Sequence, residues 1–230
     1  MNSTKTSDAM TSVGKKAAFE VKDGDVLGLG SGSAVSKFGI ALGLRIKSEK
    51  LRISALPSSL QARLIAKENG IPLMPDSAHC PVRMDLCVDG ADQVSLETRS
   101  MVKGGGGQLL KEKIIISSSK RTLILVDSSK LVKKLTFPVP VEIVQFAVEP
   151  VSQKLGDLNA KPSLRRLDKG YPYYTESGNL IIDAEFNQID DPVTLESKIK
   201  CTPGVVEAGL FNCRVDRFIV GNQDGTVDEL

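Results

Sequence analysis

The 230-residue sequence contains no tryptophan, and aromatic residues make up only 4% of it. Its hydrophobic core must therefore be built from Val, Ile, Leu and Ala, as is common in α/β proteins. The sequence also has a single histidine, His79, which lies in a predicted loop beside Cys80 and Pro81. A Ser-His-Asp triad would have to use this residue, so we expect acid–base chemistry to depend on carboxylates and lysines.

Three further features are absent: a long apolar run, a block of like charges and a C-x-x-C pair. The first absence argues against a membrane-spanning helix. The second, together with a net charge of +2, argues against a nucleic-acid or membrane partner. Scattered cysteines predict buried, reduced thiols in a reducing compartment, the cytoplasm, and their spacing does not suit a metal site. Residues 1–8 are polar, lack the apolar region of a secretory signal and are predicted to form a frayed tail.

Short apolar strands alternate with helices up to Val126. This alternation predicts a mainly parallel sheet with helices on both faces. The predicted strands cover residues 25–30, 51–56, 84–88 and 122–126, and the predicted helices cover residues 9–21, 33–48 and 59–69, with another beginning near Gln108.

The pattern changes near residue 137, where Pro138 and Pro140 interrupt the chain. Beyond this point we expect a smaller α/β unit, with strands at 171–174 and 179–186, a helix at 193–200 and an extended segment at 205–211. A strand over residues 217–220 can return to the first sheet. We therefore predict an α/β fold with a sheet domain over residues 1–135 plus 211–230 and an inserted smaller α/β domain over residues 136–210.

A glycine- and serine-rich loop, Gly28-Leu29-Gly30-Ser31-Gly32-Ser33, lies between a predicted strand and a predicted helix. Backbone amides and serine hydroxyls at a helix N-terminus favour phosphate. The third glycine comes one residue too early for a dinucleotide-binding G-x-G-x-x-G motif, and no Gly-Lys-Ser/Thr follows as in a P-loop. The alternative interpretation is a tight strand-to-helix turn without a ligand.

Two carboxylates, Asp89 and Asp92, follow a hydrophobic strand. Ligands bind at the carboxyl ends of strands in open α/β sheets, where acidic side chains can hydrogen-bond sugar hydroxyls or transfer protons. The alternative is a turn in which Asp caps the backbone.

Four consecutive glycines, residues 104–107, stand between Lys103 and a predicted helix that carries Glu112. Such a run indicates close approach of the backbone to another group, and Lys103 can supply positive charge to a phosphate or an oxyanion. Glu112 borders an apolar stripe of its helix, so partial burial would suit it to base catalysis. The alternative is an ordinary surface glutamate.

Together and in this order, these features resemble the A-type ribose-5-phosphate isomerase family. The matching segments are GLGSGSAVSKF at 28–38, VDGAD at 88–92, KGGGGQLLKEKI at 103–114, LVDSSKLVKKL at 125–135, FPVPVEI at 137–143, GNLIID at 178–183 and PGVVEAGLF at 203–211. The similarity extends from about residue 12 to residue 226.

The resemblance implies a Rossmann-like large domain, a smaller α/β domain of ferredoxin-like type, and a cofactor-free, metal-free aldose–ketose isomerisation of a pentose 5-phosphate. It implies that Glu112 is the base, and that Asp89, Asp92 and Lys103 assist ring opening, hydroxyl proton transfer and charge stabilisation. The implied substrate-binding residues are Ser31, Gly32, Ser33, Gly104, Gly105 and Lys130. It also implies a homodimer or homotetramer.

The sequence departs from the family pattern at three places. Ala34 replaces a threonine after the first loop, Gln93 replaces the glutamate of DGADE, and Met10 stands where many members have a lysine, with Lys15 and Lys16 nearby. Other functions also remain open: a non-catalytic sugar-phosphate sensor, an amino-sugar-phosphate deaminase and an oxidoreductase. The absence of a helix-turn-helix segment argues against the sensor. The absence of a well-placed histidine argues against the deaminase, and the absence of a dinucleotide fingerprint argues against the oxidoreductase.

Overall fold

The computed structural model describes residues 2–75 and 79–230, with side chains from Asp8 onward in the first helix. It divides into two compact units: residues 1–90, 111–130 and 213–230 form the first, and residues 91–110 and 131–212 form the second. This division differs from the predicted domain ranges at residues 131–135 and 211–212, and most of all at residues 91–110, which all group with the second unit. The strands within residues 91–110 pair there with strands that come later in the chain, which no local sequence pattern reveals.

The first unit is built on a six-stranded sheet with the order β14-β13-β6-β3-β1-β2. All neighbouring strands are parallel except the pair β13 and β14, so the predicted mainly parallel sheet is confirmed, as is the return of a late strand to it. The strands are β1 (Val26–Leu29), β2 (Ser54–Pro57), β3 (Leu86–Gly90), β6 (Thr122–Asp127), β13 (Arg217–Gly221) and β14 (Val227–Glu229).

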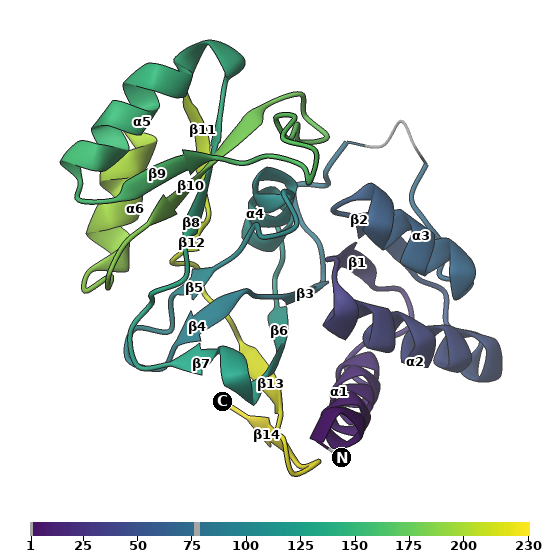
Figure 1. Cartoon of the computed structure of the whole chain (residues 1–230). Coiled ribbons are helices and arrows are strands. Elements are labelled where there is room, and N and C mark those ends of the chain that lie inside the picture. The colour runs from purple at the N-terminus through teal and green to yellow at the C-terminus, as the bar shows by residue number, and fades with distance from the viewer. Residues whose placement is uncertain (1, 76–78) are drawn as a thin grey trace. The chain divides into compact units, whose positions relative to one another are not determined.

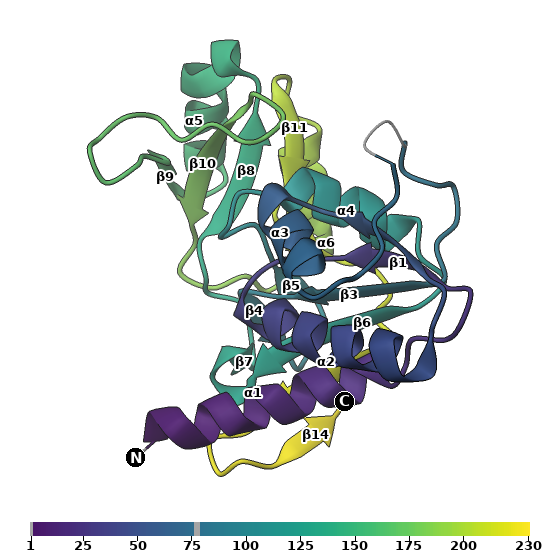
Figure 2. The ribbon, with the colours of Figure 1, turned by 90° about the vertical axis from the view of Figure 1, so that its right-hand side faces the viewer.

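Helices cover both faces of this sheet, as predicted. Helix α1 (Asn2–Ala18) and helix α2 (Ser33–Glu49) lie on one side of β1, β3 and β6, and helix α4 (Leu109–Ser117) lies on the other (Figure 2). Helix α3 (Leu60–Glu68) contributes Ala62 and Ala66 to the core that α1 and α2 share with the sheet. Its N-cap is Ser59, whose hydroxyl accepts a hydrogen bond from Ala62 N at 3.0 Å.

The N-terminal segment is helical from Asn2, so the prediction of a frayed tail over residues 1–8 is wrong for the described part of that segment. Tertiary packing explains the difference. A Cβ added to Gly221 of β13 would lie 2.9 Å from Met10 Sδ and 3.3 Å from Val13 Cγ2, so α1 packs directly against this strand. Figure 1 shows α1 beside β13 and β14.

A network of ion pairs joins the end of α1 to the last strands of the sheet. The Glu20 carboxylate contacts Arg217 at 2.5 Å and Arg121 at 3.1 Å, and Arg217 also contacts Glu229 at 3.2 Å. Glu229 in turn pairs with Lys16 at 2.7 Å. The hydrogen bond from Arg217 is the main reason that the pKa of Glu20 lies below its usual value.

This network predicts a pH-dependent contribution to stability. Because folding lowers the pKa of Glu20 from 4.5, its contribution is present above that value and is lost as the pH falls through the lowered pKa. We expect Glu20→Gln to reduce the free energy of unfolding at pH 7 by about 1 kcal/mol, since the carboxylate is partly exposed. Urea unfolding at a series of pH values should show this deficit shrinking in acid. A deficit that persists unchanged at low pH, or that also appears in the exposed control Glu68→Gln, would contradict the assignment.

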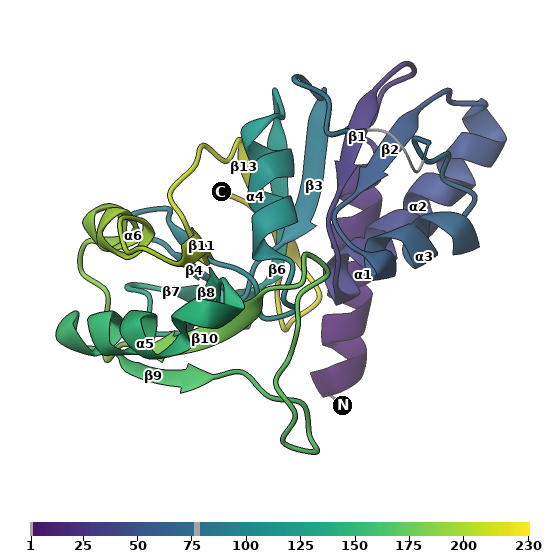
Figure 3. The same cartoon turned by 90° about the horizontal axis from the view of Figure 1, so that it is seen from above.

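The second unit contains a four-stranded antiparallel sheet with the order β11-β8-β10-β9. Its elements follow one another as β8 (Val139–Ile143), α5 (Val148–Asp157), β9 (Lys161–Leu164), β10 (Leu180–Glu185), α6 (Pro192–Lys200) and β11 (Val205–Ala208). This βαββαβ order confirms the predicted ferredoxin-like type. Helices α5 and α6 pack on the sheet (Figure 3) through a core that includes Val151, Leu155 and Ile199.

A second small sheet explains why residues 91–110 belong to this unit. Its strand order is β12-β5-β4-β7, and its strands are β4 (Gln93–Ser95), β5 (Met101–Val102), β7 (Leu131–Val132) and β12 (Leu210–Phe211). The described residues also contain two short 3₁₀ turns, η1 (Ser128–Lys130) in the first unit and η2 (Gln145–Ala147) in the second.

The strand predicted over residues 171–174 is wrong. This segment forms only the isolated bridges Arg166–Pro172 and Tyr174–Leu180, and Tyr171 and Tyr174 are exposed. The four cysteines all lie in the described residues and carry thiols, as predicted, but only Cys87 is buried and Cys201 is exposed. Within the described parts of the chain, no helix combines the length and apolar character that crossing a membrane requires.

Candidate active site

The first glycine loop follows β1 and leads into α2, at the point where the sheet changes direction. Strand β1 lies between β2 and β3, so the chain leaves β1 toward one side and later returns on the other. Open α/β sheets bind ligands at such a switch point, outside the carboxyl ends of the strands. Three neighbouring parallel strands place candidate residues at this edge of the sheet. Ser31, Gly32 and Ser33 follow β1, Asp89 lies in the last residues of β3, and Lys130 follows β6.

Each glycine of this loop is needed at its position for a different structural reason. A Cβ on Gly28 would lie 2.3 Å from Ile115 Cγ2, so Gly28 allows α4 to approach β1. A Cβ on Gly30 would lie 1.9 Å from Asp89 Oδ1, so Gly30 makes room for that carboxylate. Gly32 is the N-cap of α2 with φ at 96°, a backbone conformation that favours glycine. Its N–H donates to Gln61 Oε1 at 3.2 Å.

Asp89 is buried, with only 1% of its surface exposed. Its Oδ1 accepts a hydrogen bond from Gly90 N at 2.8 Å, which orients the carboxylate beside Gly30. The sequence left a ligand-binding role and a backbone-capping role open for this residue. The contact with Gly90 is a local cap, and the carboxylate also lies against the loop that follows β1.

The close contact between Gly30 and Asp89 predicts the effect of Gly30→Ala. The new methyl group overlaps Asp89 Oδ1, Cγ and Cβ, so the carboxylate must move. We expect activity to fall about 10²-fold, the cost of misplacing a reacting group by roughly 1 Å, and the thermal midpoint to fall as well, because overpacking a buried site is destabilising. Gly24→Ala serves as the control, since a Cβ there meets no atom within 4 Å, although its φ of 89° adds backbone strain. Full activity in Gly30→Ala would contradict a functional role for the Asp89 position.

Glu112 lies in the first turn of α4, on the opposite face of the sheet from α1 and α2. Only 6% of its surface is exposed, which confirms the burial predicted from the apolar stripe and excludes an ordinary surface glutamate. Burial removes water that would otherwise solvate the carboxylate, which strengthens its interactions with any charge that develops nearby.

The remaining candidates lie in the second unit, and two of them contact each other. Asp92 Oδ2 accepts a hydrogen bond from Gly105 N at 2.7 Å, and a Cβ on Gly105 would lie 2.8 Å from Asp92 Oδ1. Gly104 has φ at 104°, so the turn requires glycine there. The glycine run thus wraps around the Asp92 carboxylate.

Lys103 is buried, with 3% of its surface exposed. Its backbone N–H donates to Gly209 O at 2.9 Å, and its Nζ lies 5.5 Å from the centre of the Phe211 ring. A Cβ on Gly209 would lie 2.4 Å from Lys103 O, so Gly209 allows this close approach. The face of this aromatic ring attracts the ammonium group and so helps to stabilise its charge in a buried position.

Three side chains around the glycine run were not identified from the sequence. Arg165 donates to the carbonyl oxygens of Gly104 and Gly105, Asp183 pairs with Arg165, and Tyr173 Oη donates to Gly106 O at 3.3 Å. In the sequence, Arg165 precedes Arg166 and looks like part of a basic surface pair, so no local signal marks it.

The departures from the family pattern have structural explanations. Gln93 Oε1 accepts hydrogen bonds from Thr136 N at 2.7 Å and Phe137 N at 2.9 Å, so this side chain ties two segments of the second unit together. Met10 packs against Gly221, and Lys16 belongs to the ion-pair network at β14. Ala34 is buried in α2.

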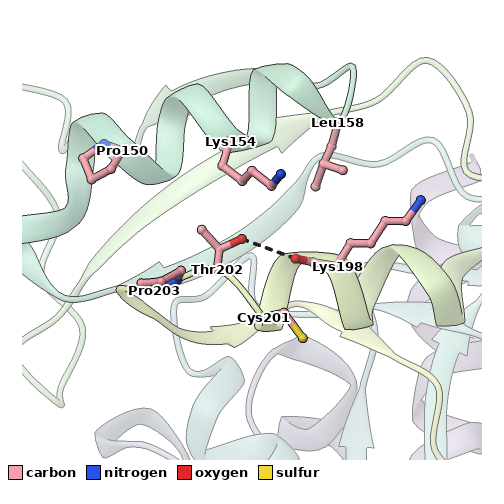
Figure 4. A pocket seen from close by; sticks show the side chains of 7 residues that line it. All are labelled: Pro150, Lys154, Leu158, Lys198, Cys201, Thr202 and Pro203. Atoms are coloured by element: carbon pink, nitrogen blue, oxygen red, sulfur yellow. Dashed lines mark hydrogen bonds between the residues drawn. The ribbon is translucent and has the colours of Figure 1, made fainter.

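A pocket of about 690 Å³ lies elsewhere in the second unit, between α5 and α6 (Figure 4). None of the candidate residues lines it. Among the residues that the structure describes, no three His, Cys, Asp or Glu side chains are grouped so that they could hold a metal. The pocket is lined by Pro150, Lys154, Leu158, Lys198, Cys201, Thr202 and Pro203.

The fold and these side chains define an α/β protein whose buried carboxylates and buried lysine suit it to acid–base chemistry. A family model described as "Ribose 5-phosphate isomerase A (phosphoriboisomerase A)" matches residues 54–225. The chain therefore belongs to the ribose-5-phosphate isomerase A family, a family of aldose–ketose isomerases, and the family predicted from the sequence is confirmed.

Individual relatives agree with this assignment. Ribose-5-phosphate isomerase A from Methanothermobacter thermautotrophicus is 40% identical over 91% of this chain and 92% of its own. The structure of ribose 5-phosphate isomerase A from Methanocaldococcus jannaschii has a TM-score of 0.89, is 40% identical and covers 97% of this chain and 98% of its own. A D-ribose-5-phosphate isomerase solved in complex with phospho-erythronic acid has a TM-score of 0.88 at 38% identity, covering 96% and 97% of the two chains.

Proposed function

We propose that this protein interconverts D-ribose 5-phosphate and D-ribulose 5-phosphate through a cis-enediolate, with Glu112 as the general base. The observation that carries the proposal is the burial of the Glu112 carboxylate on α4, in a chain that belongs to a family of isomerases. Family membership also favours this reaction over the sensor, deaminase and oxidoreductase alternatives.

The reaction requires a base near C2 and C1 of the open-chain sugar. Glu112 removes the proton from C2 of ribose 5-phosphate, which gives an enediolate, and returns a proton to C1. The hydroxyl proton at O2 leaves as the new carbonyl forms there, and O1 gains a proton. Asp89 and Asp92 exchange these hydroxyl protons and assist ring opening, and the Lys103 ammonium group stabilises the negative charge on the enediolate oxygens.

The substrate-binding residues suit an anionic sugar. Ser31, Gly32 and Ser33 offer hydroxyls and amides at the N-terminus of α2, which favours phosphate. Gly104 and Gly105 offer a backbone without side chains for close approach to the substrate. Lys130 supplies a positive charge after the carboxyl end of β6.

We expect the reaction to proceed without a cofactor or a metal, because a carboxylate and a lysine provide the base and the charge stabilisation. We place the protein in the cytoplasm and expect a homodimer or homotetramer. The phospho-erythronic acid bound by the solved relative carries a carboxylate that resembles an enediolate, so we expect it to inhibit this protein competitively.

The direct test is an isomerase assay in D₂O with a chelator present. Ribose 5-phosphate should yield ribulose 5-phosphate, and the amount of deuterium at C1 of the product measures how far the buried base exchanges its proton with solvent during turnover. Inhibition by phospho-erythronic acid should accompany this activity. A protein that binds ribose 5-phosphate without converting it would refute the proposal and support the sensor function.

A further inference from the structure

Two carbonyl oxygens of the glycine run that follows Lys103 accept hydrogen bonds from one guanidinium group. Arg165 follows β9, and its Nη1 donates to Gly104 O at 2.9 Å and to Gly105 O at 3.1 Å. The other edge of the same guanidinium faces Asp183 of β10: Nε donates to Asp183 Oδ2 at 2.8 Å, and Nη2 donates to Asp183 Oδ1. The Arg165 side chain is only 16% exposed.

Both backbone polar groups of Gly105 are therefore hydrogen-bonded to side chains. Its carbonyl oxygen accepts from Arg165, and its N–H donates to Asp92 Oδ2 at 2.7 Å. Tyr173 adds a third support, because its hydroxyl donates to Gly106 O and its ring lies 5.9 Å from the Arg165 guanidinium carbon. Four glycines in a row have almost no intrinsic conformational preference, so the loop takes its shape from these side chains together with its own backbone hydrogen bond, from Gly107 N to Gly104 O at 2.9 Å.

We propose that Arg165, oriented by Asp183, is a positioning residue that holds the 104–107 loop and the Asp92 carboxylate in the geometry needed for isomerisation. This inference rests on the proposed function, in which Asp92, Lys103 and the loop act on the sugar. Arg165 does not touch the substrate; it acts through the Gly104 and Gly105 carbonyl oxygens and through the Gly105–Asp92 hydrogen bond.

The chemistry of the contact explains why this position carries arginine. The planar guanidinium binds a carboxylate with two parallel hydrogen bonds while a third nitrogen remains available for carbonyl oxygens. A lysine ammonium group is a point charge and cannot reproduce this pattern. We therefore expect Arg165→Lys to behave like Arg165→Met rather than to rescue activity.

A purely structural ion pair is the competing explanation, and a double variant separates the two. Arg165→Met leaves Asp183 without its ion-pair partner, whereas Arg165→Met combined with Asp183→Leu removes both charges. If the pair only stabilises the sheet, the double variant regains activity. If Arg165 positions the loop, the double variant regains thermal stability but stays slow, because the Gly104 and Gly105 carbonyl oxygens still lack the guanidinium group.

The experiment measures kcat, KM and the thermal midpoint for these variants and for Arg166→Met. Arg166 is the matched control, since it is the neighbouring arginine and its contact is with Gly170 O at 2.8 Å on an exposed turn. We expect Arg165→Met, Arg165→Lys and the double variant to lose about 10²-fold in kcat/KM, mostly in kcat, the scale for a reacting group misplaced by roughly 1 Å. Arg166→Met should stay within about threefold of the parent, as expected for a substitution outside the reacting geometry.

Several results would overturn the inference. These are recovery of activity in the double variant, full activity in Arg165→Lys, or an equal loss in Arg166→Met. If Arg165→Met does not fold, Asp183→Asn replaces it as the test. This substitution keeps the size of the side chain but weakens the contact that orients Arg165. An unchanged kcat in Asp183→Asn also overturns the inference. An inactive parent protein would instead refute the proposed function, and this inference with it.

Discussion

Replacing Glu112 with glutamine is expected to reduce kcat by about 10³-fold, within the usual cost of removing a general base. Glutamine keeps the size and polarity of the side chain but cannot accept the C2 proton. Because Glu112 is buried, solvent cannot easily replace it as the base. In the proposed mechanism the carboxylate acts on the C2 proton and not on the phosphate, so KM should change little.

The measurement is steady-state isomerisation of ribose 5-phosphate, with circular dichroism to verify folding. Glu149→Gln is the matched control, because Glu149 is an exposed glutamate in the first turn of α5. We expect this control to retain parental activity. A Glu112→Gln variant that keeps more than about a tenth of the parental kcat would show that another group is the base, since even modest general-base catalysis contributes more than this.

The second large effect is expected for Lys103→Met, with a loss of about 10²- to 10³-fold in kcat, the range for removing one charge-stabilising group from an active site. Methionine fills a similar apolar volume beside Phe211, so the packing of this buried side chain is largely kept. In the proposed mechanism the ammonium group stabilises the enediolate more than it stabilises the substrate, so the effect should fall on kcat.

Lys111→Met on α4 provides the comparison, because it removes a positive charge from the same stretch of sequence at a half-buried position. Inhibition by phospho-erythronic acid gives a second measurement. Lys103→Met should weaken this inhibition in about the same proportion as kcat/KM, since a transition-state-like ligand and the enediolate need the same charge. Weakened inhibition with unchanged turnover would assign Lys103 to ground-state binding instead.

The first unit could be predicted from the sequence because its strands are nearly continuous apolar runs. Strands buried on both faces, such as β6, have this character, and the helices between them keep a regular apolar spacing. The candidate residues were found for a related reason: glycines and carboxylates at the ends of such strands stand out against apolar neighbours.

The second unit was harder to predict because its structure depends on distant contacts. Helix α5 has Pro150 in its first turn, a position that tolerates proline but weakens a helix signal in the sequence. Tyr171 and Tyr174 have side chains typical of strands, yet their segment lacks a regular pairing partner. The Arg165–Asp183 pair joins neighbouring strands β9 and β10 to a loop far earlier in the chain, which no sequence spacing indicates.

The position of β13 in the sheet has a consequence for folding of the first unit. This strand follows the whole second unit in the sequence, yet it lies between β6 and β14 and packs against α1. Until β13 pairs, the edge of β6 and the apolar side of α1, which includes Ala9 and Val13, stay exposed. Such surfaces favour aggregation, so the first unit is vulnerable for as long as the two segments that flank the second unit have not yet met.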